Sequence, residues 1–373
     1  MFKRFYEDLN PYLKPNNVLI IYGPRRVGKT VLLEKFLKET SLKYKLNNGD
    51  DLAVQEILGS GSIERIKNYA QGYELIALDE AQNIPNIGNG LKILVDHVPE
   101  IKVIATGSAS FDLTNKVGEP LTGRHLSLKL YPLAQLELLD ALTRYELEEK
   151  KSEYLIFGAY PAVLTLPTTD EKIEYLRELV NSYLLKDVLA LEQVKNSKIL
   201  LDLLRLLAFQ VGSEVSLSEL ASNLGIDYKT VARYLDLLEK GFVLINIRGF
   251  SRNLRKEITK KSKYYFYDLG VRNAIVSNFN PLNIRDDIGK LWENFLVIER
   301  IKKQEYKKIY TNNYFWRTWD QAEVDFVEER EGGIYGYEFK YRNKGKTSKQ
   351  FIKSYPKAKL EIVTQENYLD FIV

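Results

Sequence analysis

The sequence predicts a multidomain α/β protein, and two patterns near opposite ends of the chain support this prediction. A buried strand, a glycine-rich turn and a helix follow one another in "NVLIIYGPRRVGKTVLLEKFLKE", which starts at Asn17. Near the other end, a helix, several short strands, a second helix and a last strand follow one another between residues 287 and 364. A chain of 373 residues is long enough for two or three domains with cores of their own.

The composition narrows the kinds of site that the chain can hold. The sequence has no Cys and only two His, so disulfides, thiolate metal sites and imidazole-rich sites are not expected. Any bound metal should therefore have oxygen ligands. No run approaches the ~20 apolar residues of a membrane span, and the N-terminal stretch lacks a continuous apolar segment of the signal-peptide kind. We expect a cytoplasmic protein without a membrane partner.

Positive charge gathers in the C-terminal third of the chain. The whole chain has a net charge of +4, but residues 241–373 hold 25 Lys and Arg against 17 Asp and Glu, whereas residues 1–240 are net negative. A basic segment joined to an acidic one indicates a polyanionic partner, although solvated surfaces often carry a similar excess. DNA is therefore the partner that the charge distribution favours.

The glycine-rich turn matches the phosphate-binding P-loop pattern Gly-x-x-x-x-Gly-Lys-Thr. Glycines let backbone N–H groups approach phosphate oxygens, and the helix that follows adds the positive end of its dipole. In this pattern Lys29 has a catalytic role because it reaches the β and γ phosphates, and Thr30 ligates Mg²⁺. The predicted nucleotide-binding residues of the turn are Gly23, Pro24, Arg25, Arg26, Val27, Gly28, Lys29 and Thr30.

A second buried strand, in "YELIALDEAQ", ends in Asp79 and Glu80. A carboxylate at the carboxyl end of a strand lies where ligands bind in open α/β sheets. We expect Asp79 to hold Mg²⁺ through water, and Glu80 to polarise the water that attacks the γ-phosphate. The adjacent acidic pair argues against a nucleoside kinase, and the sequence contains no Asn-Lys-x-Asp guanine signature. ATP is therefore favoured over GTP.

Two further positions are candidates for the nucleotide site. The strand in "IKVIATGSAS" ends near Ser108, a polar residue that either contacts the γ-phosphate or simply forms a turn. Arg124 follows Gly123 and precedes another apolar alternation. It is either an arginine finger, acting in trans or in cis, or a lone surface arginine. A finger in trans requires an oligomer, while a monomer remains compatible with the sequence.

Together these motifs resemble the archaeal and bacterial AAA-type ATPases of the AAA_14 family, which usually carry a C-terminal DUF4143 region. The segments that carry the resemblance are the P-loop, "LIALDEAQ", "IATGSAS", Gly123-Arg124, "YPLAQLELL" and "FGAYPAVL". The resemblance implies an AAA+ nucleotide domain of the STAND kind over residues 1–130. It also implies a helical lid after that domain, which we place over residues 131–197.

Residues 198–263 are predicted to form a winged helix-turn-helix. Ser216, with Glu219 three residues later, is typical of a helix start; Gly225 ends that helix, and a second amphipathic helix and a strand follow. Such a module either contacts DNA phosphates or serves only for packing. The predicted DNA-contacting residues are Tyr228, Lys229, Thr230 and Arg233 on the second helix and Arg252 in the basic wing.

Residues 264–373 resemble the core of the restriction-endonuclease-like fold, also called PD-(D/E)xK, which the resemblance to DUF4143 proteins also implies. A helix precedes the strand-like segments "KKIYT", "YFWRTW", "AEVDFVEE" and "IYGYEFKY", and a second helix precedes the last strand, "LEIVT". The order α-β-β-β-α-β is typical of that core. Val324 stands where the family motif ideally has Pro.

The geometry of one predicted hairpin brings three charged residues to the same face. If Gly332 and Gly333 form its two-residue turn, Asp325 lies directly across from Lys340 and diagonal to Glu338. Successive side chains alternate between the faces of a strand, so the aromatic neighbours of these three residues point to the other face.

Acidic residues that converge in this way suit phosphodiester hydrolysis. Glu293, Asp325 and Glu338 are the predicted ligands of one or two Mg²⁺ ions, and Asp325 and Glu338 also count as catalytic. Lys340 is predicted to position the attacking water and to stabilise the pentacovalent charge. Two alternatives remain open: a nuclease fold kept only for DNA binding or partner docking, and a plain hairpin salt bridge between Asp325 and Lys340.

The sequence therefore predicts an ATPase with ATP and Mg²⁺ as cofactors, which binds DNA and couples hydrolysis to a nuclease-like domain. The alternative is an ATP-dependent switch that binds DNA or protein through a catalytically inactive nuclease fold.

Overall fold

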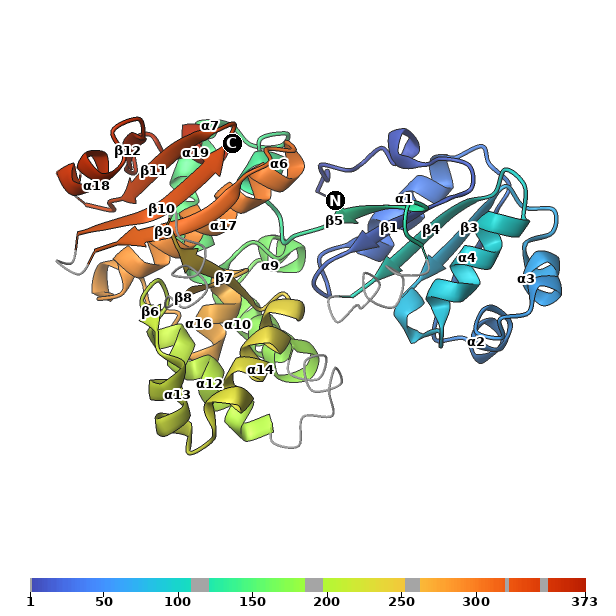
Figure 1. Ribbon diagram of the computed structural model, residues 1–373, viewed down its shortest axis with the longest axis horizontal. Coiled ribbons are helices and arrows are strands. Elements are labelled where there is room, and N and C mark those ends of the chain that lie inside the picture. Colours follow the sequence, from blue (N-terminus) through green and yellow to red (C-terminus); the bar gives the residue numbers. More distant parts are fainter. Residues whose placement is uncertain (1, 109–120, 185–196, 252–261, 319–321, 343–347) are drawn as a thin grey trace. The chain divides into compact units, whose positions relative to one another are not determined.

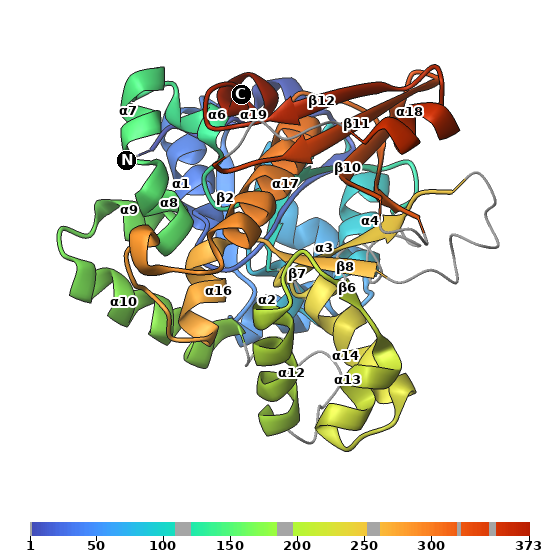
Figure 2. The same cartoon turned by 90° about the vertical axis from the view of Figure 1, so that its left-hand side faces the viewer.

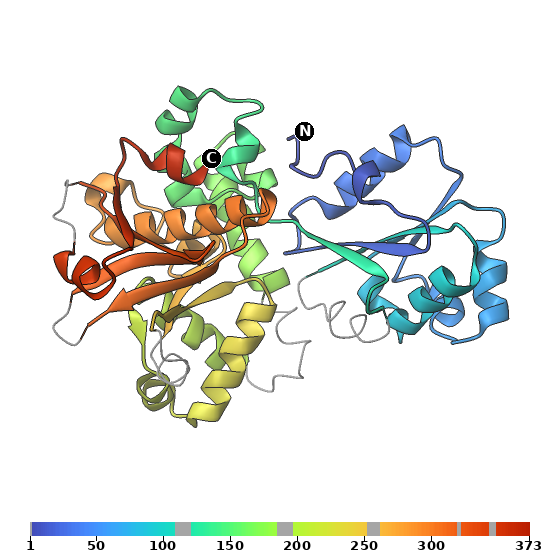
Figure 3. The ribbon, with the colours of Figure 1, turned by 45° about the horizontal axis from the view of Figure 1, so that its top comes forward.

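The structure is a computed structural model, and it describes residues 2–108, 121–184, 197–251, 262–318, 322–342 and 348–373. These residues divide into two compact units, residues 3–131 and 132–373. Each unit is built around its own sheet (Figures 1 and 3).

The first unit is an α/β domain with a five-stranded parallel sheet of order β2-β3-β4-β1-β5. Its strands are β1 (Asn17–Tyr22), β2 (Tyr44–Asn48), β3 (Leu75–Asp79), β4 (Lys102–Gly107) and β5 (His125–Lys129). Its helices are α1 (Lys29–Glu39), α2 (Leu52–Leu58), α3 (Ile63–Ala70) and α4 (Ile87–His97). Two 3₁₀ turns, η1 (Asn10–Tyr12) and η2 (Ala81–Asn83), complete it.

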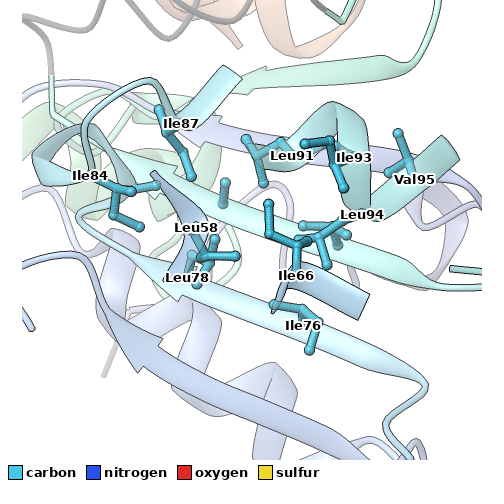
Figure 4. Close-up of a cluster of buried hydrophobic side chains, with 14 of the residues drawn as sticks. Leu58, Ile66, Ile76, Leu78, Ile84, Ile87, Leu91, Ile93, Leu94 and Val95 are labelled. Atoms are coloured by element: carbon cyan, nitrogen blue, oxygen red, sulfur yellow. The ribbon is translucent and has the colours of Figure 1, made fainter. Parts of the chain in front are cut away.

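Helices cover both faces of this sheet, which explains why its central strands are continuous apolar runs. Helices α2, α3 and α4 pack on one face, and Figure 4 shows Leu58, Ile66 and Leu91 of these helices meeting Ile76 and Leu78 of β3. Helix α1 buries Leu32, Leu33, Phe36 and Leu37. Because the strands are parallel, the carboxyl ends of β1, β3 and β4 lie at one edge, and the predicted nucleotide residues follow those ends.

The second unit contains a seven-stranded mixed sheet of order β12-β11-β10-β9-β7-β8-β6. Its strands are β6 (Glu214–Val215), β7 (Leu244–Gly249), β8 (Ser262–Phe266), β9 (Asn312–Arg317), β10 (Glu323–Arg330), β11 (Gly333–Phe339) and β12 (Lys359–Val363). Strand β7 pairs with β8 in antiparallel fashion and with β9 in parallel fashion. The two halves of the unit therefore share one sheet.

Helices surround this sheet (Figure 2). They are α6 (Gln135–Leu138), α7 (Arg144–Glu149), α8 (Lys151–Phe157), α9 (Pro161–Thr165), α10 (Thr169–Glu178), the π-helix η3 (Leu179–Leu184), α12 (Ser197–Phe209), α13 (Leu217–Leu224), α14 (Tyr228–Lys240), α16 (Leu269–Ile275), the 3₁₀ turn η4 (Leu282–Ile284), α17 (Ile288–Tyr306), α18 (Lys349–Ser354) and α19 (Tyr368–Ile372). The rings of Tyr337 on β11 and Phe371 on α19 meet on one face, and those of Trp316 on β9 and Phe351 on α18 meet on the other.

The segment "FGAYPAV" packs against the start of α16. Asp268 caps that helix by accepting a hydrogen bond from the N–H of Val271 at 3.1 Å, and its other oxygen accepts one from the N–H of Ala159 at 2.7 Å. Gly158 has φ 73°, and a Cβ there would lie 2.0 Å from an oxygen of Asp268. The glycine is therefore required for close packing.

The boundary predicted between residues 263 and 264 falls inside β8, across which the sheet is continuous. The strand predicted over "KKIYT" is wrong. Helix α17 ends at Tyr306, Lys307 caps it and Lys308 takes φ 53°, so residues 307–311 form the turn between α17 and β9.

The predicted hairpin register is also wrong, by two residues. Strands β10 and β11 pair Arg330 with Gly333, so Glu331 (φ 51°) and Gly332 (φ 74°) form the turn. Both turn residues have positive φ, as a type I′ turn requires. A register change of two leaves every side chain on its predicted face, which is why the alternation of apolar residues could not reveal the error.

Candidate functional site

The P-loop connects the carboxyl end of β1 to the start of α1. Gly23 has φ 150°, and a Cβ there would lie 2.0 Å from the carbonyl oxygen of Leu130, so the chain can pass only with glycine. Gly28 caps α1 in a left-handed conformation with φ 97°. Arg26 also has positive φ and is exposed, whereas the side chain of Val27 is fully buried.

Lys29 lies across this loop. Its side chain is buried, and its Nζ donates hydrogen bonds to the carbonyl oxygens of Gly23 at 3.0 Å and Pro24 at 2.8 Å. Pro24 is buried, and Arg25 beside it is half-buried. Carbonyl oxygens are neutral acceptors, so a phosphate oxygen is a stronger partner for the same ammonium group. The Lys29 ammonium group is therefore held at the P-loop backbone by two neutral acceptors.

A chain of hydroxyl and carboxyl groups links α1, β3 and β4. Thr30 donates its hydroxyl to Asp79 Oδ2 at 2.8 Å, and the hydroxyl of Thr106 donates to the other carboxylate oxygen of Asp79. Mg²⁺ prefers such oxygen ligands and is usually held by one or two protein groups, phosphates and water. Within the described residues, no three His, Asp or Glu side chains form a group that could hold a metal ion. The Thr30–Asp79 pair thus fits Mg²⁺ bound together with a nucleotide.

Glu80 follows Asp79 in a constrained backbone conformation. It has φ 49° and ψ 41°, a left-handed conformation that is uncommon for glutamate. Its N–H donates to the hydroxyl of Thr106 at 3.2 Å, and the side-chain amide of Gln82 donates to its carboxylate. The N–H of Ser108 donates to Gln82 Oε1 at 3.4 Å. Strained residues that neighbours hold in place are typical of functional sites.

Sequence reasoning missed two residues that support this site. Gln82 bridges Glu80 and Ser108 and lies only two positions after Glu80, so its place in "DEAQ" was an available signal. Arg4 is buried, and its guanidinium donates to the carbonyl oxygens of Val27 and Tyr131 at 2.5 and 2.7 Å. Nothing in the local sequence "MFKRFYE" marks Arg4 as a support for the P-loop.

Arg124 lies at the opposite edge of the same sheet. Its carbonyl oxygen accepts a hydrogen bond from the N–H of Val18, near the amino end of β1, whereas the P-loop follows Tyr22 at the carboxyl end. Four strand residues separate the two edges by about 13 Å. The Arg124 side chain is 44% exposed and pairs with Asp96 at 2.6 Å. This placement argues against a finger acting in cis, while a finger in trans stays a prediction.

The predicted carboxylates of the second unit come from three elements. Glu293 lies on α17, Asp325 on β10, and Glu338 and Lys340 at the carboxyl end of β11. The observed register, continued by one residue, places Asp325 opposite Glu338 rather than Lys340. Each of the two has a backbone donor: Asp325 accepts from the N–H of Phe339 and Glu338 from that of Ser348, both at 2.7 Å.

Ion pairs at this site differ from those predicted. The Nζ of Lys340 lies 3.9 Å from Glu338 Oε2, a loose contact. A lysine that sequence reasoning missed, Lys263 on β8, makes the close contacts: its Nζ lies 2.5 Å from Glu323 and 3.1 Å from Glu293. The hydroxyl of Tyr265 donates to Glu293 at 2.7 Å. Lys263 was hidden in the basic stretch that we assigned to a wing.

Burial and charge together set the pKa values here. Burial raises the pKa of Glu293 to about 7, against the opposing effects of Lys263 and Tyr265. Burial also raises the pKa of Asp325 and of Glu338. For Lys263, burial lowers the pKa, but the nearby carboxylates outweigh that effect and the net pKa is raised. Lys263 is therefore a charged, buried cation among carboxylates.

The helix predicted to contact DNA is α14. Asp227 caps it, accepting hydrogen bonds from the N–H of Thr230 at 3.0 Å and from its hydroxyl at 2.6 Å. Tyr228, Lys229 and Arg233 are exposed, whereas the hydroxyl of Thr230 is used locally. Arg252 lies outside the described residues. The buried face of α14 consists of Val231, Tyr234, Leu235, Leu237 and Leu238.

Comparisons with family models divide the chain into three segments. Residues 15–139 match the model of an AAA domain, AAA_14. Residues 148–283 match a domain of unknown function, DUF8612, and residues 288–371 match another, DUF4143. The match to the AAA domain model covers most of the first unit. Within the described residues, no helix combines the length and the apolar character that crossing a membrane requires.

Curated relatives match most of the chain. An uncharacterized protein of Mycobacterium tuberculosis is 27% identical over 333 residues, which cover 87% of this chain and 70% of the relative. An uncharacterized protein of Methanocaldococcus jannaschii is 24% identical over 381 residues, which cover 95% of this chain and 82% of the relative. The names of these relatives assign no activity.

Two solved structures show some likeness to this chain. A Walker-type ATPase of Pyrococcus abyssi aligns with a TM-score of 0.49 at 17% identity, covering 69% of this chain and 91% of that protein. A signal transduction ATPase with numerous domains, with a tetratricopeptide repeat sensor, from Pyrococcus horikoshii aligns with a TM-score of 0.26 at 15% identity. That alignment covers 77% of this chain and 43% of the other.

Proposed function

We propose that this chain is a Mg²⁺-dependent ATPase whose nucleotide cycle controls DNA binding by its second unit. The observation that carries the ATPase part is the chain of hydrogen bonds from Thr30 through Asp79 to Thr106, which lies beside the folded-back Lys29. It joins the ends of β3 and β4 to the start of α1, which is where a bound triphosphate and its metal lie in P-loop proteins.

The protein residues have separate tasks in this proposal. Backbone N–H groups at the start of α1 and the ammonium group of Lys29 bind the phosphates. Thr30 and Asp79 hold the metal, and Mg²⁺, when bound, supplies charge neutralisation of the phosphates. Glu80 orients and polarises the attacking water, and Gln82 holds the carboxylate of Glu80 in place.

Nucleotide binding tests the first step. A fluorescent ATP analogue should bind the wild-type protein in the presence of Mg²⁺, and Lys29→Ala should weaken binding at least about tenfold, since a charge-assisted hydrogen bond contributes about 1.5–3 kcal/mol. Lys45→Ala is a matched control, because Lys45 lies on β2 and contacts Tyr69 instead. Equal binding by wild type and Lys29→Ala would refute the assignment.

The second unit is proposed to combine a winged helix-turn-helix with a nuclease-like core. The order α12-β6-α13-α14-β7-β8, in which β6 and β7 both pair with β8, supports the winged helix. The order α17-β9-β10-β11-α18-β12, with parallel pairing of β11 and β12, supports the nuclease-like core. In this proposal the exposed Tyr228, Lys229 and Arg233 contact DNA phosphates.

DNA cleavage is the competing proposal for the second unit. It is favoured by the common face of Asp325, Glu338 and Lys340, which bear the acid-acid-lysine set of a metal-dependent nuclease. Linear, circular and single-stranded DNA incubated with Mg²⁺ or Mn²⁺ distinguishes the two proposals. Cleavage that Asp325→Ala and Lys340→Ala both abolish supports a nuclease, whereas steeply salt-dependent binding without cleavage supports the switch.

An oligomer is proposed only through Arg124. Its exposed guanidinium lies at the sheet edge away from the P-loop of its own chain. To reach another subunit, it must first break its ion pair with Asp96. Mass measurement with and without ATP tests whether subunits associate. A protein that stays monomeric in both states, at the concentrations where it turns over ATP, would refute a finger acting in trans.

A further inference from the structure

The carboxylates of the second unit surround a protein cation. Lys263 and Tyr265 are two residues apart on β8, so both side chains point to the same face of the sheet. Both bind Glu293, and Lys263 also binds Glu323, which begins β10. Asp325 lies near enough to act on Lys263 electrostatically. The Lys263 side chain is 2% exposed, so its charge is balanced by these groups rather than by water.

The donor and acceptor pattern of the site is that of a salt-bridge cluster. Glu293 accepts from an ammonium and a phenol, and Glu323 accepts from the same ammonium. Asp325 and Glu338 each accept from a backbone N–H. These hydrogen bonds direct the carboxylate oxygens toward fixed donors, whereas a divalent ion needs several oxygens directed at one point about 2.0–2.6 Å away.

Charge leads to the same conclusion. A Mg²⁺ or Mn²⁺ ion bound by Glu293 and Asp325 would face the buried ammonium of Lys263, with little water to screen the repulsion. If the lysine left the site, Glu293 and Glu323 would lose their ammonium partner. Removing one partner of a buried ion pair is strongly unfavourable. The residues present therefore do not fit the metal that the nuclease-like fold implies.

We propose that Lys263 is a permanent counter-ion that takes the place of a divalent metal among Glu293, Glu323 and Asp325. The second unit then works without a metal of its own and does not cleave DNA by metal-dependent hydrolysis. This inference rests on the proposed nuclease-like core and is independent of the ATPase in the first unit.

Mn²⁺ binding, measured by electron paramagnetic resonance on the full chain without nucleotide, tests the proposal. Wild-type protein and Glu293→Gln should bind the same amount of Mn²⁺, because Glu293 holds no metal in the wild type. Lys263→Met, of similar length and without charge, should gain one Mn²⁺ site, which the double variant Lys263→Met/Glu293→Gln should lose. Asp79→Asn in each background separates any contribution of the nucleotide site.

Two outcomes would overturn the proposal. One is a wild-type Mn²⁺ site that Glu293→Gln abolishes and Asp79→Asn does not. Another is a Lys263→Met protein that folds but gains no Mn²⁺ site. The carboxylates would then be unable to bind a metal ion where the lysine had been. If Lys263→Met does not fold, the wild-type and Glu293→Gln measurements still decide. ATP turnover measured on the same samples shows separately whether the ATPase proposal holds.

A different observation carries a second inference, about where DNA is bound. Residues 340–359 contain eight Lys and Arg and no Asp or Glu, which equals the entire net positive charge of residues 241–373. Helix α18 lies in this segment and buries Phe351, while Lys349, Lys353, Lys357 and Lys359 are exposed. Among the described residues, none of these four lysines makes an ion pair, although Lys359 contacts the ring of Tyr335.

We infer that this lysine surface, formed by Lys349 and Lys353 on α18 and Lys357 in the turn before β12, contacts the DNA backbone. Lys359 is not part of it, because its contact with Tyr335 places it on the face of the sheet away from α18. Unpaired lysines on one surface bind phosphates by releasing counterions, without reading sequence. Carboxylates dilute the charge of α14, where Asp236 pairs with Lys240. The lysine surface therefore exceeds α14 in uncompensated positive charge.

Fluorescence anisotropy with labelled duplex DNA, over a range of salt concentrations, tests this inference, which rests on the proposed DNA binding. The triple variant Lys349→Glu/Lys353→Glu/Lys357→Glu should bind more than tenfold more weakly and lower the slope of log affinity against log salt by about 2–3, at about 0.9 per lost phosphate contact. Lys229→Glu/Arg233→Glu on α14 should have the smaller effect. The reverse ranking would overturn the inference, and wild-type protein that binds no DNA would instead refute the DNA part of the proposed function.

Discussion

Replacing Thr106 with valine tests how the nucleotide site is organised. The Thr106 side chain is fully buried; its hydroxyl donates to Asp79 and accepts the N–H of Glu80 at 3.2 Å. Valine preserves the shape of the side chain and removes only the hydroxyl. The substitution therefore leaves one carboxylate oxygen and one backbone N–H without their partner.

The expected magnitude follows from these two losses. A hydrogen bond to a charged group contributes about 1.5–3 kcal/mol, and an unpaired buried N–H costs about 1–3 kcal/mol. Asp79 keeps its bond from Thr30 and is 9% exposed, so water partly compensates. We expect Thr106→Val to lower the free energy of unfolding of the first unit by about 2–4 kcal/mol.

The same substitution should affect turnover more than binding. Without Thr106, the strained backbone of Glu80 loses a hydrogen bond that fixes it, so the attacking water is oriented less well. We expect ATP affinity to change little and kcat to fall about 10–100-fold. Denaturant unfolding, ATP titration and phosphate release measure the three quantities, and Thr106→Ser should restore all of them. Unchanged stability and unchanged kcat in Thr106→Val would refute the reasoning.

Three further predictions concern other parts of the molecule. Gly158→Ala should destabilise the second unit by about 3 kcal/mol or more, because the new Cβ would collide with Asp268. Gly225→Ala is the control: Gly225 has φ 65° and open space around it, so the substitution should cost only about 1 kcal/mol. Thermal or denaturant unfolding measures both effects. Burial raises the pKa of Glu239 to about 7, so the folded state binds this proton more tightly than the unfolded state does. The free energy of unfolding should therefore fall as the pH rises from about 4.5 to about 7. Glu239→Gln should flatten that part of the measured pH profile. Arg124→Ala should leave ATP turnover unchanged under conditions where mass measurement shows monomers, because the residue lies at the sheet edge away from its own P-loop; a slower monomer would contradict that placement.

The sequence could locate the proposed nucleotide site because the signals for its residues are local. The P-loop turn needs glycines at fixed positions, and the continuous apolar runs before Gly23 and Asp79 are typical of buried parallel strands. Thr30 and Asp79 are 49 positions apart, yet each follows from its own motif, and parallel strands bring their ends to one edge. Arg4 had no such signal, because its role depends on contacts with backbone carbonyl groups far along the chain.

The second unit was harder to predict because its important contacts are not local. The alternation of apolar and polar residues along the hairpin predicted the correct sheet face for Asp325 and Glu338. It could not determine how β10 and β11 pair residue by residue. Lys263 is 60 positions from Glu323, and a basic stretch gives no indication that one of its lysines is buried. Only the pairing of β7 with β9 shows that β8 belongs to the same sheet as the carboxylates.

Phosphate release from ATP by wild-type protein and Glu80→Gln, in the presence of Mg²⁺, tests the central claim most directly. Wild-type protein should hydrolyse ATP. Glu80→Gln should bind ATP with the same affinity as wild type but hydrolyse it at least about 100-fold more slowly, since a positioned base contributes a factor of about 10²–10⁴ to the rate. Hydrolysis by Glu80→Gln at the wild-type rate, or purified protein that binds no ATP, would contradict it.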